Sequence, residues 1–157
     1  MKNFFRFIWG QIVSFMPGAT GVMFTPRRGE SAWYNALHKS ALTPPGWVFG
    51  AVWTVLYFLL GWALYLIMKN HRPWRQKLKA YTLFGVHLFL NALWTYWFFG
   101  LHLMDISLLV LGALLVVAIW MMRAFGAIDR RAGRMLWPYV IWLGFALYLN
   151  GATVYMN

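Results

Sequence analysis

The chain of 157 residues contains no cysteine and only three acidic residues. Without cysteine there is no disulfide and no thiolate metal site, and the sequence carries no information on the redox state of its compartment. The acidic residues are Glu30, Asp105 and Asp129, and none lies inside a long apolar run. Acid–base catalysis within such a run would therefore lack a carboxylate, so we expect no conventional catalytic arrangement and no metal site.

Charged side chains are scarce along most of the chain, because 14 basic and three acidic residues gather in short clusters. Each of the five segments between them is long enough for a bilayer-crossing helix, which takes about 17–25 residues. A soluble helical core, the alternative, would need regular polar stripes, and residues 106–122 have only Ser107 as a polar side chain. The sequence therefore predicts an all-α integral membrane protein, a five-transmembrane-helix bundle forming one domain over residues 1–157. Its helices are expected near residues 5–25, 47–68, 80–100, 105–122 and 135–156.

The first apolar run follows Lys2 and Arg6, as in a secretory signal peptide. It continues to Phe24, however, without a clear small-residue cleavage pattern. We therefore interpret it as the first membrane helix. The five expected spans then begin and end on opposite sides of the membrane.

The basic residues fall mainly on one side of these spans. That side carries the N-terminus and the connections at 69–79 and 123–134, with eleven Lys and Arg against three on the other. Because such an excess marks the cytoplasmic side, we predict a bacterial cell membrane protein with its N-terminus inside and its C-terminus outside. Basic residues also attract anionic lipid headgroups, so membrane lipid explains the net charge of +11 without a nucleic-acid partner.

The connection between the first two helices, residues 26–46, is much longer than the others. Long loops are usually functional or disordered, and a disordered segment would not contain Trp33, Tyr34, Leu37 and Leu42. We therefore predict a lid packed over the outer ends of the helices. The alternative is a loop lying among the headgroups, where Trp and Tyr are also common.

The second expected helix carries a face of aromatic and small residues. The Pro-Pro-Gly sequence at 44–46 marks its start, because proline is compatible with the first helical turn. Gly50, Trp53, Tyr57 and Gly61 then recur at spacings of three and four and share one face. Hollows between the rings of such a face would suit a flat hydrophobic guest.

Trp53 and Trp142 differ from most of the eleven tryptophans, which lie near expected span ends, in the aromatic belt. At a rise of ~1.5 Å per residue, Trp53 lies about 9 Å and Trp142 about 10 Å inside opposite surfaces. In a core roughly 30 Å thick, the two rings would differ by about 10 Å in depth, the width of a large planar heterocycle. The same geometry is compatible with two unrelated packing residues.

A few polar side chains lie within the expected spans, where they are costly and often functional. His87, Asn91 and Thr95 recur every four residues and form one stripe. Interhelical hydrogen bonding is the simpler role, which we expect for Thr95 and Asn150. His87 could bind a metal through its imidazole, but no Cys, Asp or Glu within the spans would share the site.

Three segments of the chain resemble one family. Trp33-Tyr34 and residues 44–53 resemble the second-helix signature of the translocator proteins, the tryptophan-rich sensory protein (TspO) family. Residues 91–100, with Asn91, Trp94 and the Phe-Phe-Gly sequence, resemble its third-helix motif. Residues 138–150 resemble its fifth-helix motif P-Y-x-x-W-x-x-F-A-x-x-L-N. The resemblance covers nearly the whole chain.

This resemblance implies a five-helix bundle, often a homodimer, that binds porphyrins such as protoporphyrin IX and other planar aromatic ligands. The porphyrin is a ligand in this interpretation, with no obligatory or covalent cofactor. Some bacterial members degrade protoporphyrin in light, which would give Trp53 and Trp142 a catalytic, photo-oxidative role. The ligand-binding residues expected by position are Trp53, Tyr57, Asn91, Trp142 and Ala146, to which we add Trp33 from the lid.

Three function classes remain open: tetrapyrrole binding for sensing or transport, light-dependent oxidation of protoporphyrin IX, and a membrane scaffold with an incidental cavity. The shortage of acid–base residues argues against conventional catalysis, although photochemistry needs only a pigment, light, oxygen and an oxidisable ring. The chain departs from the family at Ser40, Leu42 and Tyr96, where proline, tryptophan and proline are usual. It also ends without the basic residue of the family's cholesterol motif, so sterol transport is not predicted.

Overall fold

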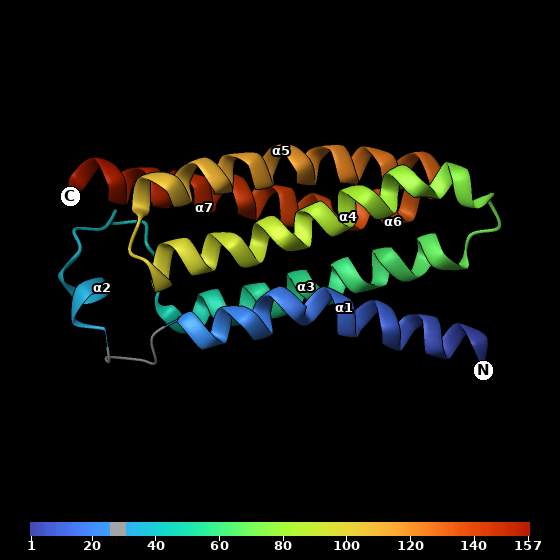
Figure 1. Cartoon of the computed structure of the whole chain (residues 1–157), viewed down its shortest axis with the longest axis horizontal. Coiled ribbons are helices and arrows are strands. Elements are labelled where there is room, and N and C mark those ends of the chain that lie inside the picture. The colour runs from blue at the N-terminus through green and yellow to red at the C-terminus, as the bar shows by residue number, and fades with distance from the viewer. Residues whose placement is uncertain (26–30) are drawn as a thin grey trace.

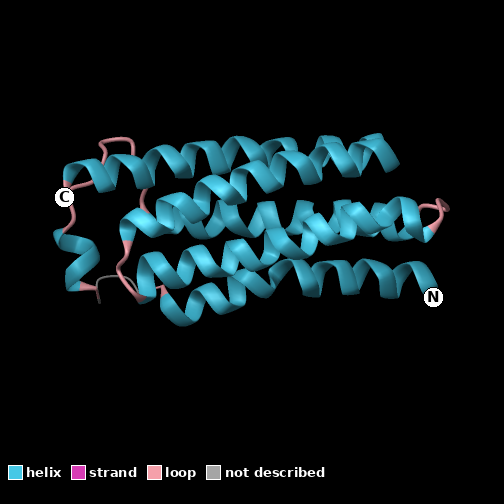
Figure 2. Ribbon diagram, turned by 45° about the horizontal axis from the view of Figure 1, so that its top comes forward, coloured by secondary structure: helices cyan, strands magenta, loops and turns pink. Residues whose placement is uncertain are grey.

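The computed structural model describes residues 1–25 and 31–157, and every regular element in these ranges is helical. The long helices run side by side, with the N-terminus and the C-terminus at opposite ends (Figure 1). Short loops connect them at both ends of the bundle (Figure 2). The elements are α1 (Lys2–Phe24), α2 (Ala32–Ala36), α3 (Gly46–Lys69), α4 (Trp74–Thr95), the π-helical turn η1 (Tyr96–Gly100), α5 (Met104–Ile128), α6 (Arg130–Met135) and α7 (Trp137–Met156).

Four stretches of the described residues are long and apolar enough to cross a membrane, namely α1, α3, α5 and the α6–α7 stretch Arg130–Met156. α4 is also long, at 22 residues, but its first turns carry Arg75, Lys77 and Lys79. These charges lower the mean hydropathy of α4 below that of the other long helices. The chain is therefore a helical multi-pass membrane protein, as the sequence predicts.

Several helix boundaries differ from those expected. α4 begins at Trp74 rather than near residue 80, directly after Pro73, because a charged first turn is stable outside the hydrocarbon. α5 continues past residue 122 to Ile128, where Phe125 is fully buried. The last expected helix, residues 135–156, corresponds to α7, whereas α6 forms a separate short helix in the expected connection before it, and the Asp129 side chain caps its start. The charge-free runs predict where a helix leaves the lipid. The helix itself continues for as long as its backbone hydrogen bonds do, which is beyond that point in α4 and α5.

α1 packs most extensively on α3, and glycine allows the close approach. A Cβ added at Gly10 would lie 2.7 Å from the carbonyl oxygen of Gly61. Small residues at a crossing are typical of helix pairs in membranes. Gly61 was expected to leave a hollow, which is wrong, because the Gln11 side chain of α1 fills that space. Gly50, on the same face of α3, does border open space.

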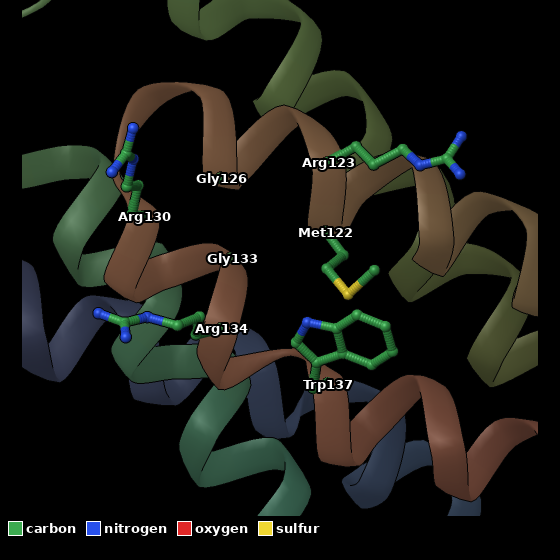
Figure 3. Close-up of a pocket in the computed structure, with 7 residues that line it drawn as sticks. All are labelled: Met122, Arg123, Gly126, Arg130, Gly133, Arg134 and Trp137. Carbon is green, nitrogen blue, oxygen red and sulfur yellow. The ribbon is translucent and has the colours of Figure 1, made fainter.

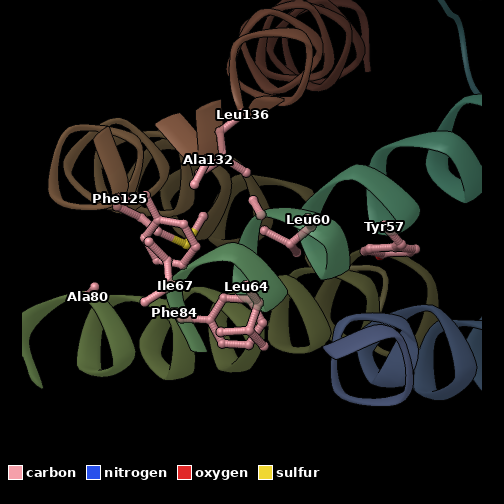
Figure 4. Close-up of a cluster of buried hydrophobic side chains, with 11 residues drawn as sticks. Tyr57, Leu60, Leu64, Ile67, Ala80, Phe84, Phe125, Ala132 and Leu136 are labelled. Atoms are coloured by element: carbon pink, nitrogen blue, oxygen red, sulfur yellow. The ribbon is translucent and has the colours of Figure 1, made fainter. Parts of the chain in front are cut away.

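Buried apolar side chains form two clusters that meet at α3. The first joins α3, α4, α5 and α6 and includes Ile67, Phe84 and Phe125 (Figure 4). The second joins α3, α5 and α7 and includes Tyr139. Trp53 packs against both clusters, so it lies where the two halves of the core meet.

Two polar side chains were expected to join helices. Asn150 does so, because its Nδ2 donates to Ser107 Oγ at 3.1 Å and thereby links α7 to α5. The expectation for Thr95 is wrong, since its hydroxyl donates to the Asn91 carbonyl of its own helix. Thr95 contributes to packing instead, and a Cβ added at Gly21 of α1 would lie 3.4 Å from its methyl group.

We expect Gly10→Ala to lower the free energy of unfolding by about 1–3 kcal/mol, because the added methyl group overpacks the α1–α3 crossing. Gly112→Ala on α5 is the matched control, since a Cβ there meets nothing within 4 Å. Its effect should be neutral or stabilising, because alanine favours helix by about 1 kcal/mol over glycine. Thermal unfolding in detergent, followed by circular dichroism, measures both, and equal melting temperatures would contradict the close crossing.

Candidate functional site

A chain of hydrogen bonds between polar side chains joins three helices in the middle of the bundle. The Tyr57 hydroxyl of α3 donates to Asn91 Oδ1 of α4 at 2.9 Å. Asn91 Nδ2 donates in turn to the Tyr139 hydroxyl of α7, also at 2.9 Å. Tyr139 lies 2.6 Å from Nε2 of His87, one turn before Asn91 on α4. All four side chains are buried, so each bond is made without competition from solvent.

Tyr139 is the partner of His87 within this chain. Its hydroxyl accepts from Asn91 Nδ2, and which of Tyr139 and His87 donates in their shared bond depends on the tautomer of His87. The other ring nitrogen of His87, Nδ1, is buried and has no partner among the described residues.

Trp53 lies directly against this hydrogen-bonded chain. Its ring centroid is 5.3 Å from that of Tyr57 and 6.1 Å from that of Tyr139. Trp142 follows Tyr139 by one helical turn and contacts Phe49 of α3, with centroids 5.7 Å apart. Trp53, Trp142 and Ala146 all belong to or pack against the second core cluster.

The structure thus brings five of the six expected site residues into one region of α3, α4 and α7. We call this region the aromatic site. Their proximity is observed, whereas their role in binding stays a prediction. The aromatic site consists of Trp53, Tyr57, Asn91, Trp142 and Ala146, together with Tyr139 and Trp94.

Two indole donors of the aromatic site are unpaired. The Nε1 atoms of Trp94 and Trp142 are buried, and neither has a hydrogen-bond acceptor within the described residues. A buried donor left unpaired costs about 1–3 kcal/mol, so such groups usually have a reason to persist. The exposed tryptophans are different: Trp47 and Trp120 are 62% and 54% exposed, as expected for side chains in the membrane belt.

Trp33, the sixth expected residue, lies apart from the others. Its ring stacks on His102 in the α4–α5 connection, with centroids 3.9 Å apart, and also contacts Phe98 of η1 at 5.7 Å. His102 has a φ of 59°, which is uncommon for a residue with a side chain. Phe98 stacks in turn on Trp94 of the aromatic site, at 5.8 Å, so one ring links Trp33 to that site.

The described part of the expected lid, residues 31–46, is packed on the end of the bundle. Ser31 caps α2, and the Lys39 ammonium group donates to the carbonyls of Tyr34 and Leu37. Asn157 exchanges two hydrogen bonds with the backbone of His38 and so ties this segment to the end of α7. Residues 26–30 of the expected lid lie outside the described residues.

Two depressions of the described residues lie outside the aromatic site. One, of about 420 Å³, is formed by α5, α6 and the start of α7, and an apolar one of about 200 Å³ lies between α1 and α4. Within the aromatic site, Phe49 of α3 contacts Trp142 of α7. Otherwise α3 and α7 touch only lightly. Among the described residues, no three His, Asp or Glu side chains come close enough to hold a metal ion.

Tyr139 is the site residue that sequence reasoning missed. It forms the junction between Asn91 and His87, yet it was noted only as part of the fifth-helix motif. A signal was available, because Tyr139 precedes Trp142 by three residues and shares its helix face. The side chains of His87 and Asn91 also need hydrogen-bond partners when they are buried, which predicts a polar side chain opposite them on another helix.

A helical multi-pass membrane protein with tryptophans packed around a buried polar chain is the class that fold and site define. The chain belongs to the TspO/MBR family, whose model matches residues 11–156. It is 32% identical over 140 residues to "Tryptophan-rich protein TspO" of Chlorobaculum tepidum, covering 89% of this chain and 88% of that protein. Identity with the protein of the same name from Archaeoglobus fulgidus is 35% over 145 residues, covering 89% of each chain. Human "Translocator protein" is 35% identical over 123 residues, covering 75% of this chain and 70% of that protein.

Tyr139→Phe tests the hydrogen-bonded chain. The substitution leaves Asn91 Nδ2 and His87 Nε2 without their shared partner, so we expect a loss of about 1–3 kcal/mol in unfolding free energy. Tyr155→Phe is the control, because Tyr155 is 91% exposed and its hydroxyl makes no hydrogen bond within the described residues. Chemical unfolding of both variants in one detergent gives the comparison. A Tyr139→Phe protein as stable as the parent would show that the chain is energetically unimportant.

Proposed function

We propose that this protein binds porphyrins of the protoporphyrin IX class in the aromatic site and acts in tetrapyrrole sensing or transport. The observation that carries this proposal is that Trp94 and Trp142, whose buried indole donors have no acceptor within the described residues, pack against the same core cluster and against further aromatic rings. An aromatic guest with acceptor atoms would supply both the ring contacts and the missing hydrogen bonds. The names of the relatives, which include tryptophan-rich sensory and translocator proteins, support the same class of function.

The binding region follows from the light contact between α3 and α7. Gly50 borders open space on the face of α3 that also carries Trp53, so ring movement there meets little backbone resistance. Trp53 is braced by Tyr57 and Tyr139, whereas Trp142 contacts the side chains of Phe49 and Phe145. A planar guest would insert between the Trp53 ring, which two tyrosine rings hold in place, and the Trp142 ring, which would move aside. Each new ring contact is worth ~0.5–1.5 kcal/mol beyond the area that it buries.

We further propose that α4 is the fifth membrane-crossing helix of the bundle. It packs on both α5 and α1, and residues 80–104 are free of charge. An isolated polar first turn is compatible with a span, because lysine side chains near helix ends reach the membrane surface. With five spans, the excess of Lys and Arg at the end of the bundle that carries the N-terminus puts that end in the cytoplasm.

Light-dependent oxidation of protoporphyrin is a second candidate function. The specific observation in its favour is the position of Trp53, an oxidisable indole in contact with Tyr57 and Tyr139. The Tyr139 hydroxyl in turn lies 2.6 Å from His87 Nε2, which accepts the phenol proton in the tautomer that carries its own proton on Nδ1. Neighbouring oxidisable rings of this kind would allow a photoproduct to form at the site.

The proposal is tested by titrating the purified protein with protoporphyrin IX in darkness. We expect a red-shifted absorbance band on binding to the parent. Trp142→Ala removes a wall of the site, so its Kd should rise by about tenfold or more from lost stacking and apolar area. Trp120→Ala, at an exposed position on α5, is the control and should bind like the parent. Absence of any spectral change with the parent would leave the scaffold interpretation.

Illumination of the same samples separates binding from photo-oxidation. Bleaching that requires the protein would support the second function, and stable absorbance would support the first. Trp142→Phe should keep a flat ring and therefore most of the binding, while slowing the bleaching, because phenylalanine is much harder to oxidise than tryptophan. Bleaching at the parental rate in this variant would exclude the indole of Trp142 from the reaction.

The lid role of residues 31–46 is tested through Trp33. Its ring is anchored on His102 and Phe98, so Trp33→Ala should loosen the segment and raise the porphyrin off-rate more than it lowers the on-rate. The variant should also be cut more readily by added protease, with ligand protecting the parent better. A loop that merely rests among the headgroups would leave the off-rate unchanged, and stopped-flow displacement measures this directly.

A further inference from the structure

A basic depression lies at the end of the bundle that carries the N-terminus. α2 and the C-terminus lie at the opposite end of the long axis of the bundle (Figure 1). Its volume is about 420 Å³, and it opens widely to the surface. None of its lining residues belongs to the aromatic site. We call it the arginine depression, and its lining residues are Met122, Arg123, Gly126, Arg130, Gly133, Arg134 and Trp137.

Two glycines shape the floor of the arginine depression. A Cβ added at Gly133 of α6 would lie 2.6 Å from Cα of Gly126 on α5, so the two backbones are in direct contact. A Cβ at Gly126 would meet only Gly133, at an ordinary 3.7 Å. The floor is therefore bare backbone.

The rim combines three positive charges with an apolar wall. Arg123, Arg130 and Arg134 are exposed and their guanidinium groups point outward in different directions, whereas the Met122 and Trp137 side chains face each other between them (Figure 3). The neighbouring carboxylate, Asp129, accepts hydrogen bonds from the backbone N–H groups of Arg131 and Ala132 at the start of α6. Asp129 therefore lies there as the cap of α6. The three guanidinium groups outnumber this one carboxylate, so the surface carries net positive charge.

This combination has the chemistry of a phospholipid headgroup site. Guanidinium groups bind phosphate oxygens through paired, charge-assisted hydrogen bonds. Trp137, 54% exposed at the start of α7, is of the type found at the membrane surface, where it can contact the glycerol and upper acyl region. We propose that the arginine depression binds the phosphate group of an anionic phospholipid. The apolar wall favours a lipid over a free phosphate ion, which would use the arginines alone.

The test compares two triple variants that remove the same charge from the same end of the protein. Arg123→Gln/Arg130→Gln/Arg134→Gln empties the rim, and Arg72→Gln/Arg75→Gln/Lys79→Gln neutralises the α3–α4 connection and the start of α4. Full-length protein in an uncharged detergent is titrated with phosphatidylglycerol, phosphatidylcholine or inorganic phosphate, and bound lipid is counted by native mass spectrometry. Loss of the charge-assisted bonds should weaken phosphatidylglycerol binding by about tenfold or more in the first variant alone.

A second variant keeps the charge and fills the floor. Gly126→Met adds a long side chain where a Cβ makes only ordinary contact, so the helix should fold while phosphatidylglycerol binding falls. Protoporphyrin titration of each variant reports on the separate aromatic site and on correct folding. Equal losses in both triple variants would indicate diffuse surface charge and overturn the proposal. Undiminished lipid binding by Gly126→Met would also overturn it, and inorganic phosphate binding as tightly as phosphatidylglycerol would overturn the assignment to lipid.

Discussion

The hydrogen-bonded chain from Tyr57 through Asn91 and Tyr139 to His87 constrains the rest of the structure. Within lipid, a polar group without a partner costs several kcal/mol, so these side chains must meet wherever the helices pack. These hydrogen bonds fix how α3, α4 and α7 are rotated about their own axes and how they are shifted along one another. Trp53 is consequently pressed against two tyrosine rings, and the second core cluster closes around it.

The two regions with ligand chemistry differ because their helices meet in different ways. α3 and α7 touch lightly through large aromatic side chains, which can move apart without breaking backbone hydrogen bonds. α5 and α6 touch through glycine backbone at Gly126 and Gly133, which cannot move apart without losing the contact itself. A deformable apolar seam is the surface on which the proposed porphyrin site rests, whereas a bare glycine floor beside exposed arginines is the surface on which the proposed lipid site rests.

Much of the fold and part of the site could be predicted from residue patterns. The charge-free runs predicted the four helical stretches that are apolar enough to cross a membrane, and the depth of Trp53 singled out an indole that lies beside the buried chain. Gly61 and Gly50 occupy equivalent positions on one helix face, yet only Gly50 borders open space, because Gln11 of α1 fills the other. Thr95 was misassigned since a hydroxyl in a helix can bond its own backbone as readily as a neighbour. What fills the space beside Gly61, and which partner Thr95 bonds, depend on the neighbouring helix. The periodicity of the sequence does not identify that helix.

The sequence by itself determined that this chain is helical, membrane-spanning and aromatic at its centre, since lipid admits few alternatives to runs of apolar residues in helices. It also determined the basic end, because charge is a property of composition. Only the tertiary structure decided that Tyr139 joins Asn91 to His87, that Trp33 stacks on His102 away from Trp53, and that Arg123 shares a depression with Arg130 and Arg134. Each of these is a contact between segments distant in sequence, so it exists only once the relative rotation and depth of the helices are set by packing.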